Sequence, residues 1–202
     1  MADQTTSYYS LGMGNYEAWV ATLGPSSEIQ YDPVTGKEDF TGLRKVKAYF
    51  ANWNPSQTWT PQPICVHEED VGRKLSFADR ISYRAVGPII SENAVKKMRP
   101  LLEREGHILL LDVRNRDEKF YFWWVPWVKD SVDFERSEKH LRGLSYKKPA
   151  INHYNIKGLT AFRPHFEDMY NPEGQGDVLV SDEFRMKWLE EGLTGIEFKP
   201  TI

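Results

Sequence analysis

Residues 177–200 carry the clearest hydrophobic pattern of the chain, and it changes from strand spacing to helix spacing and back. Residues 178–180 form a short apolar run of the kind that fills a buried strand. Large apolar side chains then recur in residues 184–189 with the spacing of one helical face. In residues 196–198 apolar and polar positions alternate. The pattern therefore predicts a strand, a helix and a returning strand.

The polar residues of this segment mark the ends of the predicted helix. Ser181 is a suitable N-cap, because its hydroxyl oxygen can accept a hydrogen bond from an unpaired N–H of the first turn. Asp182 and Glu183 place negative charge near the positive end of the helix dipole. Gly192 can end the helix in a left-handed conformation that other residues reach only with strain. Each of these residues thus has a structural task.

A similar pattern occurs earlier, in residues 88–113. An apolar pair precedes Ser91, which is placed as a second N-cap, and residues 108–113 form a returning apolar run. The first helix is therefore either longer than the second or broken near Pro100. Two interpretations stay open: a structural repeat, or a chance likeness between two capped helices that lie between strands.

The rest of the chain predicts shorter elements. Residues 45–53 alternate in polarity like a strand, and residues 120–128 form an aromatic strand that is bent or ended at Pro126. Residues 130–137 predict an acidic turn that opens a helix. Residues 11–23 predict a short helix or an irregular aromatic segment.

The division into regions follows from the prolines of residues 54–63, which predict a loop or linker. We therefore expect a partly irregular N-terminal region, residues 1–63, whose first ten residues are polar and loose. An α+β domain, residues 64–202, should follow. The expected fold class is α+β, with mixed sheets, β-α-β-like units and, in one of the two interpretations, an internal duplication.

Composition narrows the class of protein. With 40% hydrophobic and 27% charged residues, the 202-residue chain resembles a soluble globular protein. A net charge of −3 gives no general attraction to nucleic acid or to an anionic membrane. The single Cys65 excludes an internal disulfide, and no apolar run is long enough for a membrane span or a signal peptide. We expect a cytoplasmic protein.

The sequence contains no familiar catalytic, dinucleotide-binding or metal-binding motif, so we expect no catalysis, no cofactor and no metal. The alternative is a divalent-metal-dependent nuclease or hydrolase, in which Asp112 and Asp117 hold the ion and Lys119 activates water. The short spacing, with Arg114 and Arg116 between these residues, is more typical of a hairpin turn.

An ordered set of motifs runs through the second half of the chain. Its segments are GPIISENA (87–94), VKDSVDFERS (128–137), AFR (161–163) and VSDEFRMKWLEEGLTGIEFKP (180–200). This set resembles a bacterial immunity-protein family of polymorphic toxin systems, formerly described as a domain of unknown function. Residues 1–63 show no clear match to that family.

The resemblance implies an α+β protein that binds and neutralises a cognate toxin made by the same cell, without catalysis. Such a protein needs aromatic anchors and charges that complement the toxin. If the toxin is a nuclease, acidic residues could mimic the phosphates of its substrate. The contact candidates selected on this basis are Trp53, Trp59, Trp127, Asp130, Asp133, Glu167, Asp168, Glu173 and Asp177. The oligomeric state stays open.

Overall fold

The computed structural model describes residues 7–12, 19–23, 30–31, 38–39, 50, 53–68, 78–81, 87–139, 146–165 and 178–201. Its strands are β1 (Tyr8–Gly12), β2 (Trp19–Leu23), β3 (Gln30–Tyr31), β4 (Glu38–Asp39), β5 (Pro63–Glu68), β6 (Arg80–Ile81), β7 (Ile89–Ser91), β8 (His107–Leu110), β9 (Asp112–Val113), β10 (Phe120–Trp124), β11 (Trp127–Val128), β12 (Val132–Lys139), β13 (Tyr146–Ile151), β14 (Ala161–Pro164), β15 (Leu179–Ser181) and β16 (Glu197–Pro200). The helices are α2 (Glu92–Glu105) and α3 (Asp182–Glu190). The expected α+β class is confirmed.

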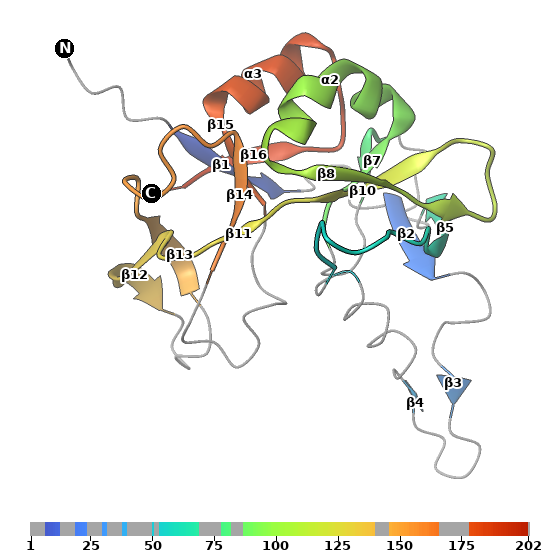
Figure 1. The fold of residues 1–202 in the computed structure, drawn as a ribbon, viewed down its shortest axis with the longest axis horizontal. Coiled ribbons are helices and arrows are strands. Elements are labelled where there is room, and N and C mark those ends of the chain that lie inside the picture. Colours follow the sequence, from blue (N-terminus) through green and yellow to red (C-terminus); the bar gives the residue numbers. More distant parts are fainter. Residues whose placement is uncertain are drawn as a thin grey trace.

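Two β-α-β units dominate this fold. The first unit has strand order β6-β7-β10-β8, and its helix α2 connects β7 to β8. The second unit has order β14-β15-β1-β16, extended by β11, and its helix α3 connects β15 to β16. Every neighbouring pair within the four-strand sets is antiparallel, so the two strands that a helix connects run parallel with one strand between them. The helices lie side by side above the sheets (Figure 1).

The hydrogen-bond register is the same in both units. Ser91 lies opposite Phe120 of the middle strand in the first unit, as Ser181 lies opposite Tyr8 in the second. The backbone bonds outside the ladders correspond as well: Glu92 N to Lys119 O and Asp182 N to Ser7 O at 3.1 Å, Leu111 N to Phe120 O and Thr201 N to Tyr8 O at 3.0 Å. Residues 88–113 and 177–200 therefore occupy equivalent places in two units of the same architecture.

The units differ in the origin of their middle strand. In the first unit β10 follows β8 along the chain, whereas in the second the middle strand is β1. Tyr8 and Leu11 are buried there, and the Tyr8 hydroxyl donates to Ile156 O at 2.7 Å. The expectation that the first ten residues are loose is wrong for β1. This strand forms backbone hydrogen bonds with β15 along one edge and with β16 along the other.

Both predicted N-caps are confirmed. Ser91 Oγ accepts from Ala94 N at 3.1 Å, and Ser181 Oγ accepts from Phe184 N at 3.3 Å. Helix α2 continues through Pro100 without a break, so the first helix is the longer one. Helix α3 stops earlier, and Gly192 follows it with φ +65°, as the stop signal predicted.

Reciprocal hydrogen bonds join the two units. Asp79, just before β6, accepts from Ser91 Oγ at 2.7 Å in its own unit and from Thr194 N at 3.1 Å in the other. In return, Thr160, just before β14, donates its N–H to Glu105 Oε1 at 3.0 Å at the end of α2. Its hydroxyl accepts from Arg104 at 2.6 Å. Each unit therefore holds the other at equivalent positions.

Apolar side chains fill both faces of the sheets. Between sheets and helices, Phe184 stacks on Trp123 at 5.2 Å and on Trp188 at 5.9 Å. Phe122, next to Trp123 in β10, belongs to a second cluster that also contains Phe50 and Trp53. Since neighbouring residues of a strand face opposite sides, this second cluster lies under the sheet.

Residues on both sides of the expected boundary at residue 63 share these clusters and sheets. Phe50 and Trp53 pack with residues of β7 and β10, β2 pairs with β5, and β1 pairs with β15. The boundary therefore does not separate two cores within the described residues.

Three local predictions are wrong, and a fourth is confirmed. Residues 19–23 form strand β2 and not a helix, while Phe50 is helical and not in a strand. The expected helix after residue 130 is strand β12, which pairs with β13. Pro126 separates β10 from β11, as predicted. Within the described residues, neither helix has the length and apolarity needed to cross a membrane.

The two caps should differ in their contribution to stability. Ser181→Ala should lower the free energy of unfolding by about 1 kcal/mol, the usual value for a lost cap. Ser91→Ala should lower it by about 2–4 kcal/mol, because the Ser91 hydroxyl also donates to the buried Asp79 carboxylate. Urea unfolding of both variants measures the difference, with Ser91→Thr as the control that keeps the hydroxyl. Equal losses would show that the Asp79 contact contributes nothing.

Tyr8 should make stability depend on alkaline pH. Burial raises the pKa of its phenol to about 12. The unfolded phenol ionises near pH 10, so the stabilising effect is complete below about pH 10 and is lost as the pH rises to about 12. Between these limits the wild type should lose about 1–2 kcal/mol more than Tyr8→Phe. Urea unfolding at several pH values tests this, and parallel curves for the two proteins would contradict it.

Candidate functional site

The tryptophans selected as contact candidates differ in exposure. Trp53 is 5% exposed and packs against Trp59 and Trp124 at 5.9 and 5.5 Å between ring centres, so it is a core residue and not a surface anchor. Trp59 is half-buried, and its Nε1–H donates to Leu110 O at 2.6 Å. Its ring therefore covers the edge of the cluster under the first sheet. Trp127, in β11, is half-buried as well.

The two acidic candidates of the 128–137 motif lie at a turn and a hairpin. Asp130 is exposed and adopts φ +54°, and its backbone oxygen accepts from Asn155 at 2.8 Å. Asp133 is half-buried, and its carboxylate accepts from Arg136 N at 3.1 Å. Ser137 spans the β12–β13 bulge, because its hydroxyl donates to Asp133 O and accepts from Ala150 N. This motif shapes the hairpin and leaves the Asp130 carboxylate in solvent.

The other acidic candidates are Glu167, Asp168, Glu173 and Asp177, and they lie outside the described residues.

Two of the three residues of the enzymatic alternative, Asp112 and Lys119, are paired with other charged groups. Asp112 pairs with Arg114 at 2.5 Å, and Lys119 Nζ lies 3.9 Å from Glu92. Asp117 is exposed in the turn between β9 and β10. Among the described residues, no group of three or more His, Cys, Asp or Glu side chains is arranged to hold a metal ion. No specific contact in this region favours catalysis.

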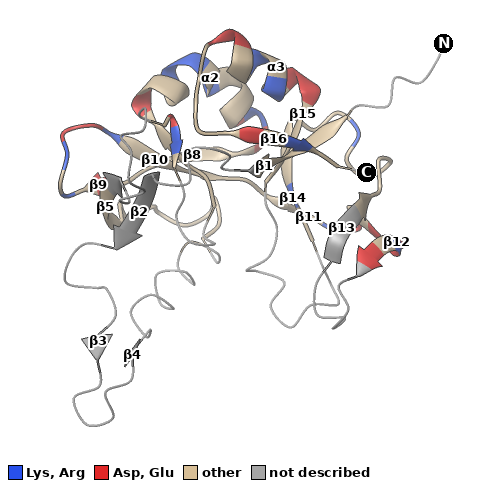
Figure 2. Ribbon diagram, turned by 180° about the vertical axis from the view of Figure 1, so that it is seen from behind, with Lys and Arg blue, Asp and Glu red and all other residues tan. Residues whose placement is uncertain are grey.

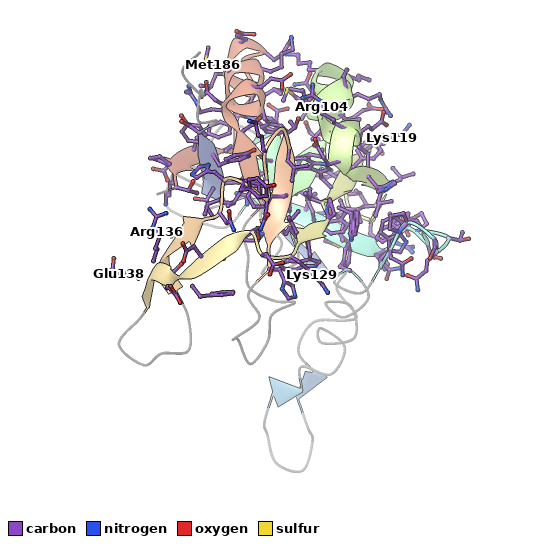
Figure 3. All side chains as sticks on the ribbon, turned by 60° about the vertical axis from the view of Figure 1, so that its left-hand side comes forward. Arg104, Lys119, Lys129, Arg136, Glu138 and Met186 are labelled. Atoms are coloured by element: carbon purple, nitrogen blue, oxygen red, sulfur yellow. The ribbon has the colours of Figure 1, made fainter. Side chains whose placement is uncertain are left out.

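A shallow groove of about 430 Å³ runs between α2 and α3. Two of its basic side chains form ion pairs within the molecule: Arg104 binds Glu183 at 2.7 Å, and Lys187 binds Glu191 at 2.6 Å. The hydrogen bond from Arg104 holds the pKa of Glu183 below its ordinary value. Figure 2 shows the two charge signs interspersed along both helices. Arg104 and Met186 lie at this end of the molecule, far from Arg136 and Glu138 (Figure 3).

A different group of residues meets where the two sheets join, and we call it the Arg163 seam. It consists of Gly87, Phe122, Trp127 and Arg163. Arg163, in β14, is only 4% exposed, and its backbone N–H donates to Pro126 O at 2.9 Å. Its guanidinium carbon lies 5.8 Å from the ring centre of Phe122 and 5.5 Å from that of Trp127.

The guanidinium of the seam lacks a counter-charge within the described part of the chain. Arg163 Nε and Nη2 are buried and have no hydrogen-bond partner there. Burial lowers the pKa of Arg163 to about 10. His165 lies two residues further along the chain, and its Nδ1 is also buried without a described partner. A buried, uncompensated cation is unfavourable by several kcal/mol, and the aromatic faces offset only part of that.

Gly87 makes room for this guanidinium. It adopts φ +136°, and a Cβ at this position would lie 2.6 Å from Arg163 Nη2 and 2.8 Å from Phe122 Cε2. Gly87 opens the 87–94 motif and Arg163 closes the 161–163 motif, so two motifs distant in sequence meet in one contact. Neither motif carries a local sequence signal of this contact.

Comparisons of the sequence with protein-family models and with curated proteins find no match.

Gly87→Ala should destabilise the protein by about 2–4 kcal/mol, because it combines a strained backbone with overlap on Arg163. Gly158 is the matched control, since it has φ +82° but open space around a Cβ. Gly158→Ala should therefore cost only the backbone strain, about 1 kcal/mol. Urea unfolding compares the two variants. Equal effects would mean that the packing around Arg163 is loose.

Proposed function

We propose that this protein is an immunity protein that acts in the cytoplasm, where it binds and neutralises a cognate bacterial toxin without catalysis of its own. The proposal rests on the resemblance of the ordered motifs. Its main structural support is the contact between Gly87 and Arg163, because residues of two separate motifs meet at one place. A set of motifs that come together in space supports a likeness of the whole fold more strongly than separate matches do.

The roles of the other motif residues support the same proposal. Ser91 and Ser181 cap the two helices, and Ser137 fixes the β12–β13 hairpin. These polar residues are used to build a rigid framework. A preformed framework suits an inhibitor, because little conformational freedom is then lost when the toxin binds.

The contact surface we propose retains the exposed candidates. Asp130 keeps a solvent-facing position next to the β12–β13 hairpin, and Trp59 and Trp127 present partly exposed rings. The acidic residues of the 167–177 segment complete the candidate set. Charges of this sign would complement a basic toxin surface and speed its association. Trp53 is excluded from the set by its burial.

Protection of cells is the direct test of this function. Cells that express a toxin gene from the neighbourhood of this gene should survive only when this protein is produced, and the two proteins should co-purify. Asp130→Lys should weaken binding at least tenfold if the acidic surface meets a basic toxin.

Two control variants sharpen the test. Ser181→Ala lowers stability but leaves the proposed surface intact, so it should protect and bind like the wild type. Asp112→Ala should also protect fully. Loss of protection in Asp112→Ala, together with metal-dependent turnover by the wild type, would contradict the proposal and favour a hydrolase.

A further inference from the structure

The Arg163 seam combines a cation with surroundings that do not neutralise it. Arg163 is 4% exposed, it lies between the Phe122 and Trp127 rings, and its Nε and Nη2 are unpartnered within the described residues. In contrast, the surface residue Arg185 also lies over an aromatic ring, that of Tyr9 at 5.0 Å, but is bonded to Asp182 at 2.8 Å. The two arginines thus share a cation–π contact and differ in the presence of a counter-ion.

The two unpartnered nitrogens define the geometry of a ligand. Nε–H and one Nη2–H point outward along the same edge of the guanidinium plane. A carboxylate fits this edge with two parallel hydrogen bonds, which are stronger than bonds between neutral groups. Such bonds gain further strength when water is excluded by apolar neighbours, here Phe122 and Trp127.

Size and charge restrict the ligand further. Gly87 packs closely against Nη2, so a large group has no room on that side of the guanidinium. Arg163 carries a single positive charge, so a monovalent anion neutralises it, whereas a dianion would leave one buried negative charge unpaired.

We propose that the Arg163 seam is a binding site for a small planar monovalent oxyanion, of which formate is the simplest carboxylate. The anion accepts hydrogen bonds from Arg163 Nε and Nη2 and neutralises the buried charge. The site does not depend on the proposed toxin partner, and it can be tested on the isolated protein.

Formate is the probe for this site. Thermal unfolding is measured in chloride-free buffer, with sodium gluconate replacing sodium formate so that the ionic strength stays constant. For the wild type, each tenfold rise in formate above its dissociation constant should increase the folding equilibrium constant about tenfold. Arg163→Met should lose this dependence, and Arg185→Met, the matched surface control, should keep it.

Arg163→Met should also be at least as stable as the wild type when formate is absent, since it removes an uncompensated buried charge at similar volume. A marked loss of stability in Arg163→Met, with a wild type that does not respond to formate, would show that Arg163 is a structural cation–π residue and would overturn the proposal. An equal response to formate in both proteins would overturn it too.

A measurement on the folded wild type covers the case in which the methionine variant does not fold. In an NMR titration, the Arg163 Nε–H resonance, assigned by comparison with Arg163→Lys, should shift with formate and reach saturation. Gluconate at equal ionic strength should leave it unchanged. A resonance that formate does not move would contradict the proposal.

Discussion

The hydrogen bonds of the Asp79 carboxylate determine how the two halves of this molecule fit together. It accepts from Ser91 and Asn93 at the start of α2 and from Thr194 in the turn after α3. A buried carboxylate must have such partners, because water cannot reach it. The requirement therefore fixes the N-terminus of one helix relative to the turn that follows the other.

The corresponding position of the second unit uses different chemistry for the same purpose. Thr160 occupies the position that corresponds to Asp79. The charged groups here come from the end of α2: Arg104 donates to the Thr160 hydroxyl, and Glu105 accepts from the Thr160 N–H. Both junctions also include a backbone bond of 2.8 Å to the capping serine of their own unit, Ser91 or Ser181. The framework is thus conserved between units in its backbone bonds, while the side chains that complete it differ.

The local features of this framework could be predicted from sequence, and the long-range ones could not. The caps at Ser91 and Ser181 and the stop at Gly192 depend on a few neighbouring residues, so their signals are contained in short segments. Strand β1 has no such local signal, because Tyr8–Gly12 shows no clear alternation of its own and becomes a strand only between β15 and β16. The burial of Trp53 likewise depends on contacts with distant residues.

The Arg163 seam could be predicted from the sequence even less than the long-range features of the framework. In the sequence AFR (161–163) is only a short motif, because the residues next to Arg163 do not indicate an unpaired buried charge. That property arises from Phe122, Trp127 and Gly87, which belong to three other segments. Each contributes a common residue type in an ordinary setting, so their combination carries no sequence signature.

Arg163 lies one residue beyond the described positions at which the two units correspond. Ala161 and Phe162 pair with β15 as Arg80 and Ile81 pair with β7, so these positions correspond. One residue further, β14 pairs in parallel with β11, which lies outside the four-strand set, and Arg163 is opposite Trp127. Equivalent positions of a repeat are constrained by the shared framework and serve its stability. A strand position that pairs outside the four-strand set, as Arg163 does with β11, is free of that constraint, which is why an energetically unfavourable group can be placed there for binding.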